Sequence, residues 1–110
     1  MLFVSVDDFF QQAQRATRLT HDEEKQLALQ MKGGDAEARQ KLIHSYYPLL
    51  ASYVKRMPKE LQTLKAVYSF LQSLEAGIDN FHFQQDSEPF IHHLSWRMRQ
   101  CITRCIADRP

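Results

Sequence analysis

The strongest constraint on the fold is a run of apolar residues spaced alternately three and four apart. It occupies positions 64–81 and consists of Leu64, Val67, Leu71, Leu74, Ile78 and Phe81. Because a helix completes a turn every 3.6 residues, this spacing puts all of them on one stripe, which is typical of a helix packed lengthwise against another. The chain offers no alternating β-branched run of the kind that forms a half-buried strand. The sequence therefore predicts an all-α protein.

Capping residues mark further helices. Ser5, Thr20 and Asp35 carry oxygens that can accept hydrogen bonds from the first N–H groups of a helix, so each is expected to precede one. Thr20 and Glu23 have the spacing of a capping box. The helix after Thr20 is expected to end at the glycine pair 33–34, because glycine readily adopts the left-handed geometry that ends a helix.

Two prolines bound the remaining helices. The helix after Asp35 keeps its apolar spacing and is expected to run unbroken until Pro58. The last helix is expected to open at Ser87, with Pro89 in its first turn. Together with the helix at 64–81, these elements predict a compact bundle of about five helices.

The size and composition of the chain fit a single domain spanning residues 1–110. A chain of 110 residues with 44% hydrophobic content can bury one core but not two. No apolar run reaches the roughly 18 residues of a membrane span, and Asp7 and Asp8 follow the start without the basic leader of a secretion signal. Cys101 and Cys105, four apart in an expected helix, make a poor disulfide framework. We therefore expect a cytoplasmic location.

The net charge is only +1, but the charged residues are unevenly distributed along the chain. Between residues 94 and 110 stand one acid and four arginines, a local balance of +3, the arginines being Arg97, Arg99, Arg104 and Arg109. Clustered positive charge is the electrostatic footprint of a surface that binds polyanions. The C-terminal segment is therefore where we expect phosphate to bind.

The expected last helix carries the one tryptophan of the chain on its polar face. At about 100° per residue, the stripe facing the core consists of Phe90, Ile91, Leu94, Met98, Cys101, Ile102 and Cys105. Trp96 falls nearly opposite, in line with His93, Gln100, Thr103 and Arg104. Such a ring can stack on an unpaired base while arginines hold phosphates and polar side chains reach base edges. The alternative is a tryptophan packed under a neighbouring helix, beside arginines that are only solvated.

Four segments of the chain resemble one protein family. Residues 96–108 read WRMRQCITRCIAD, which is similar to the signature helix of the bacterial sigma-seventy family, where two tryptophans open the run. Residues 19–24, 34–44 and 49–56 resemble other helices of the same domain, the promoter-reading domain two of an RNA polymerase sigma factor. The resemblance spans about residues 9–108 and implies the helical fold of that domain.

The resemblance implies a role in transcription initiation. In that family the domain binds the clamp helices of the RNA polymerase core and reads the minus-ten promoter element, flipping bases out of the non-template strand. By position, Gln100 and Thr103 match residues that read the upstream duplex edge of that element. Arg99 and Arg104 match basic positions beside the DNA backbone, and Trp96 matches the aromatic residue at the melted junction.

The sequence departs from the family pattern in two places. Arg97 replaces the second tryptophan, and His93, also assigned to the nucleic-acid site, replaces a tyrosine, so base flipping is expected to be altered. The acidic motif that docks on the polymerase clamp should fall near 65–69, where acids are absent and Lys65 reverses the charge. Docking is therefore expected to be weakened or to use different contacts.

These departures support a second hypothesis, a sigma-like helical module repurposed for protein interaction or regulation without DNA reading. Tyr47, Tyr68 and Phe70 are less clearly inward than the other aromatic residues, and exposed together they would mark a partner surface. The sequence fits a stand-alone domain and a fragment of a longer protein equally well.

Catalytic and metal chemistry find little support in the sequence. Cys101 and Cys105 could share a metal with His92 or His93, but a structural zinc site needs four convergent ligands and both cysteines lie on the apolar stripe. We expect core packing for them. The sequence contains no glycine-rich phosphate loop after a strand and no nucleophile with a recognisable partner pattern. We expect neither an enzyme nor a cofactor.

Overall fold

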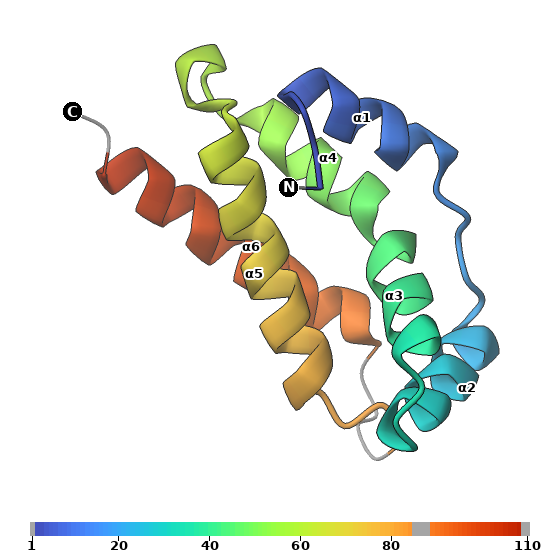
Figure 1. The fold of residues 1–110 in the computed structure, drawn as a ribbon. Helices are drawn as coiled ribbons and strands as arrows, with labels where there is room; N and C mark the ends of the chain where they lie inside the picture. Colours follow the sequence, from blue (N-terminus) through green and yellow to red (C-terminus); the bar gives the residue numbers. More distant parts are fainter. Residues whose placement is uncertain (1, 85–88, 109–110) are drawn as a thin grey trace.

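The structure is a computed structural model that describes residues 2–84 and 89–108 (Figure 1). Over these ranges the regular elements are helical, and the prediction of an all-α protein is confirmed. None of the described helices is long and apolar enough to cross a membrane. In chain order the elements are α1 (Val6–Arg15), α2 (His21–Lys32), α3 (Ala36–Ser45), α4 (Tyr47–Arg56), the 3₁₀ turn η1 (Lys59–Leu61), α5 (Leu64–Asn80) and α6 (Phe90–Ala107).

The predicted cap residues close the N-termini of α1, α2 and α3. The side chains of Ser5 and Asp35 accept backbone N–H hydrogen bonds of 3.0–3.1 Å at the starts of α1 and α3. At α2 the Thr20 hydroxyl accepts from the Glu23 N–H, and the Glu23 carboxylate accepts from the Thr20 N–H. Hydrogen bonding of the Glu23 carboxylate to Thr20, first to its backbone N–H and then to its side chain, lowers the pKa of Glu23. The predicted capping box is confirmed.

The turn between α2 and α3 requires glycine at one of its two glycine positions. Gly34 has a φ of 97°, in the left-handed region, whereas Gly33 has a φ of −78°. We expect Gly34→Ala to lower the free energy of unfolding by about 1–2 kcal/mol, because a Cβ is strained in left-handed backbone. Gly33→Ala is the matched control and should cost nothing, since its backbone suits any residue. Urea unfolding compares the two variants, and equal losses would contradict this account of the turn.

The segment after Asp35, expected as one helix, is divided in two. α3 ends and α4 begins at Tyr46, and Pro48 lies in the first turn of α4. Proline has no N–H, and in a continuous helix its ring would collide with the carbonyl of His44, so the helix breaks before it. Tyr46 is buried, and its hydroxyl donates to the carboxylate of Glu24 on α2. Burial, together with this hydrogen bond, raises the pKa of Tyr46. The prediction of an unbroken helix is wrong.

α5 lies at the centre of the helix packing. It packs against α6 and also meets α1, α3 and α4 (Figure 1). The stripe predicted for this helix is confirmed, because its middle is buried at Val67, Leu71, Leu74 and Ile78, with Leu64 and Phe81 half-buried at its ends. This packing fixes one side of α6 and leaves the other side to solvent.

The aromatic residues considered for a partner surface do not form one. Tyr47 and Phe70 are buried, and Tyr68 is half-buried. The N-terminal segment covers the two tyrosines, because Phe3 is buried beside the Tyr47 ring and its N–H donates to the Tyr68 hydroxyl at 3.2 Å. The expectation of an exposed patch at these positions is wrong.

Candidate nucleic-acid interface

The inner side of α6 anchors the helix in the core. The Phe90 ring lies among the rings of Tyr46, Phe81 and Phe83, with centroid separations of 5.0–5.2 Å. Buried side chains then recur at helical spacing down this side, at Leu94, Met98 and Cys101. Because this side is held over three turns, the orientation of the opposite face is fixed.

Two details of α6 differ from the prediction. Ile91, assigned to the core stripe, is 43% exposed, because it lies at the edge of the stripe in the first turn. Pro89 holds the N-cap position, and Ser87 falls outside the described residues. Ile102, at the same edge of the stripe, is half-buried.

Four of the predicted site residues lie together on the solvent-facing side of α6. Trp96 is 58% exposed, as its position opposite the core stripe predicts. Arg99, Gln100 and Thr103 are also exposed and stand three, four and seven positions further on, so they share its helix face. The Thr103 hydroxyl donates to the Arg99 carbonyl at 3.0 Å, which fixes the position of its oxygen. We call these four residues the Trp96 face.

The other two predicted site residues, His93 and Arg104, lie at the edge of α6 that borders α5. The His93 ring stacks on Phe81 at a centroid distance of 5.6 Å, and its Nε2 accepts a hydrogen bond from Arg97 Nε at 3.1 Å. The Arg104 guanidinium donates to Cys101 Sγ at 3.5 Å. The structure therefore does not align these two side chains with Trp96, and their part in nucleic-acid binding stays a prediction.

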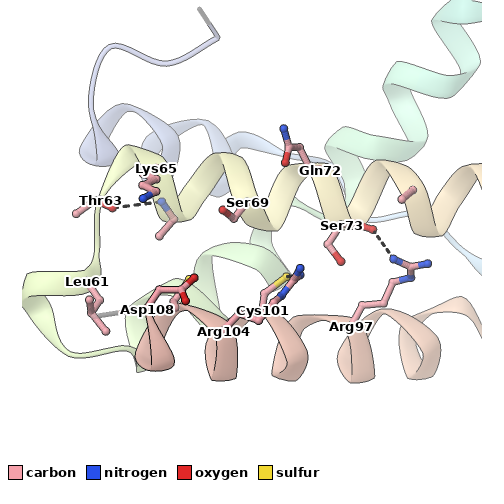
Figure 2. A pocket seen from close by; sticks show the side chains of 13 residues that line it. Leu61, Thr63, Lys65, Ser69, Gln72, Ser73, Arg97, Cys101, Arg104 and Asp108 are labelled. Atoms are coloured by element: carbon pink, nitrogen blue, oxygen red, sulfur yellow. Dashed lines mark hydrogen bonds between the residues drawn. The ribbon is translucent and has the colours of Figure 1, made fainter. Parts of the chain in front are cut away.

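A groove of about 490 Å³ separates the N-terminal half of α5 from the C-terminal half of α6 (Figure 2). Polar side chains line both of its walls. The α5 wall carries Lys65, Ser69 and Ser73, and the α6 wall carries Arg97, Cys101 and Arg104. We call this space the α5–α6 groove.

Arg97 reaches across to α5 at the end of the groove far from Asp108 (Figure 2). Its guanidinium donates to the Ser73 carbonyl at 3.5 Å (Figure 2). Gly77 makes this position available, because a Cβ there would lie only 3.1 Å from Arg97 Cδ. Sequence reasoning missed this contact. The available signal was a glycine in the interior of a helix, which often marks a close approach by another group.

The two cysteines pack against the inner wall of the groove. Cys101 is buried and Cys105 is half-buried, and both are free thiols. Burial, followed by the neighbouring Cys101, raises the pKa of the Cys105 thiol, so it stays protonated at neutral pH. Within the described ranges no group of three or more His, Cys, Asp and Glu side chains is arranged to hold a metal ion. The expectation that Cys101 belongs to the core is confirmed.

Comparison with known proteins shows which curated proteins this chain resembles. Over 96 residues, which cover 86% of this chain, the sequence is 32% identical to the RNA polymerase sigma factor SigA of Listeria monocytogenes serovar 1/2a. The aligned region is sigma-factor-like. The same identity and coverage hold for the SigA sigma factor of Listeria innocua serovar 6a. This sigma-factor-like chain spans about a quarter of the length of these curated relatives. No family model and no solved structure gives a significant match.

Proposed function

We propose that this sigma-factor-like chain acts in transcription initiation in the bacterial cytoplasm, as the equivalent of domain two of a sigma factor. In this proposal it binds the minus-ten element of promoter DNA on the non-template strand and attaches to the RNA polymerase core. The similarity to SigA supports the general role. The observation that carries the DNA-binding part is the exposed Trp96 beside three exposed polar or basic side chains on one helix face.

Each residue of the Trp96 face has a distinct task in this proposal. The Trp96 ring stacks on an unpaired base, which every base permits because each has a flat π-face. The Arg99 guanidinium contacts phosphate and supplies affinity that does not depend on sequence. Gln100 and Thr103 offer amide and hydroxyl groups that can hydrogen-bond base edges, so they supply the preference for one sequence.

Attachment to the polymerase is proposed to use contacts other than paired carboxylates. Lys65 is exposed at the start of α5 and Ser69 is half-buried one turn later, so this stretch of α5 offers no acid to a basic clamp surface. Lys65 can instead form an opposite-charge contact with acidic residues that the partner supplies.

The contribution of Arg99 is tested by the salt dependence of binding. The dissociation constant of a fluorescein-labelled single-stranded oligonucleotide is measured by anisotropy between low and moderate salt. We expect Arg99→Ala to reduce the slope of log affinity against log salt by about one unit, because one fewer phosphate contact releases fewer counterions.

The matched control for this measurement is Arg18→Ala, which removes an exposed arginine between α1 and α2, away from α6. Its salt slope should equal that of the wild type. An Arg99→Ala slope equal to the wild type, or an equal decrease in both variants, would count against phosphate binding at the Trp96 face.

A second candidate function, a sigma-like module that binds a protein partner without reading DNA, is favoured by the polar α5–α6 groove. The DNA titration separates the two candidates, because a folded protein that binds neither single-stranded nor duplex promoter DNA leaves only the second.

A further inference from the structure

The α5–α6 groove concentrates positive charge on a side of α6 that the proposed DNA contact does not use. Lys65 from α5 and Arg97 and Arg104 from α6 line it, against the single carboxylate of Asp108 at its end (Figure 2). In residues 2–84 and 89–108, none of these three cations forms an ion pair with a carboxylate. Three cations without acidic partners create a local field that attracts anions.

The walls of the groove also offer hydrogen-bonding groups and an apolar floor. Ser69 and Gln72 line the α5 wall, while Ala66 and Cys101 are buried side chains at its base. A small inorganic anion would leave this apolar surface uncovered. A ligand that combines carboxylates with an apolar side chain would use both kinds of surface.

The dimensions of the groove indicate what form this ligand takes. A volume of about 490 Å³ lies in the range of small-ligand pockets, about 300–1,000 Å³, so the ligand is expected to be a short segment. Arg97 and Arg104 stand seven residues apart on α6, a rise of about 10.5 Å. In an extended peptide, residues four apart point to the same side and lie about 13 Å apart. This separation is close to that of the two arginines, and the long arginine side chains can reach across the difference.

We propose that the α5–α6 groove binds an extended acidic segment of a partner protein, in which two carboxylates flank an apolar side chain. The carboxylates pair with Arg97 at one end and with Arg104 and Lys65 at the other, and the apolar side chain lies on the floor formed by Ala66 and Cys101. This surface is separate from the Trp96 face, so the inference does not depend on the proposed DNA binding.

A labelled peptide provides the test. The probe is a fluorescein-labelled peptide with the core glutamate, serine, leucine, serine, glutamate, and the control peptide has lysine in place of both glutamates. We expect the full chain to bind the first peptide and not the second. Lys65→Glu and Arg104→Glu should each weaken binding about tenfold, because each places a like charge beside a carboxylate.

The matched control variant is Lys41→Glu, which makes the same charge change at an exposed position on α3. Lys65, Arg104 and Lys41 are all exposed, so the variants are expected to stay folded, and circular dichroism with a thermal melt checks this. Lys41→Glu should bind the acidic peptide as the wild type does.

Three results would overturn the proposal. The first is no binding of the acidic peptide, and the second is an equal loss in Lys41→Glu, which would mean attraction to net charge alone. The third is displacement of the peptide by inorganic phosphate or single-stranded DNA at matched concentration, which would assign the groove to a different anion. In Trp96→Ala the peptide should bind normally, so failure of the DNA proposal and failure of this one are distinguishable.

Discussion

Trp96→Ala is expected to weaken binding of a single-stranded minus-ten-type oligonucleotide about 5- to 150-fold, the range that removal of one base-stacking aromatic produces. The side chain is 58% exposed and lies opposite the buried stripe of α6, so its loss should leave the fold intact. Anisotropy of a labelled oligonucleotide at fixed low salt measures the change.

Two further variants make this measurement specific to stacking. Trp96→Phe keeps an aromatic face and should retain most of the affinity. Leu29→Ala removes an exposed apolar side chain of α2, 54% exposed, and should bind as the wild type does. Undiminished binding in Trp96→Ala, with the protein folded, would remove the tryptophan from the interface.

The second large effect is expected in the core, at the start of α6. Phe90 is buried among the rings of Tyr46, between α3 and α4, and of Phe81 and Phe83, in the segment that follows α5. Phe90→Ala should lower the free energy of unfolding by about 3–5 kcal/mol, because it removes the largest fully buried side chain of the helix and leaves a cavity.

The neighbouring residue supplies the control for this prediction. Ile91 is 43% exposed, and Ile91→Ala should change the free energy of unfolding by less than about 1 kcal/mol. Urea unfolding followed by circular dichroism measures both variants. A loss in Phe90→Ala no larger than that in Ile91→Ala would contradict the packing described for α6.

Local signals in the sequence predicted most of the helix boundaries. The caps at Ser5, Thr20 and Asp35 depend on atoms within a few residues, so they can be recognised without knowledge of the rest of the fold. The break at Tyr46 also has a local cause, which is Pro48 in the first turn of α4. The apolar spacing predicts one helix because it continues across the break. Periodicity alone cannot distinguish one helix from two consecutive helices that keep the same apolar spacing.

The candidate site was predicted only where one helix determines it. The exposure of Trp96 follows from its position on α6 relative to the buried stripe, so the helical period placed it correctly. The positions of His93 and Arg97 depend on Phe81 and Gly77, which belong to the C-terminal end of the neighbouring helix α5. No period within α6 contains that information, because contacts between helices are set by packing angles and side-chain shapes.

The covered aromatic residues illustrate the same limit. Tyr47 is buried because Phe3, more than forty positions earlier, packs on its ring. The sequence marks Phe3 as apolar but gives no indication of which surface it covers. The prediction of a partner surface there failed for this reason, while the α5–α6 groove, assembled from two helices, was not predicted at all.

The most direct test of the central claim is a titration of a fluorescein-labelled minus-ten-type single strand with the folded chain, with and without RNA polymerase core. The proposal predicts binding that tightens when polymerase is present, that favours the promoter-like strand over a scrambled one, and that is weakened in Trp96→Ala. Equal binding of both strands, or no binding in either condition, would contradict promoter reading by the Trp96 face.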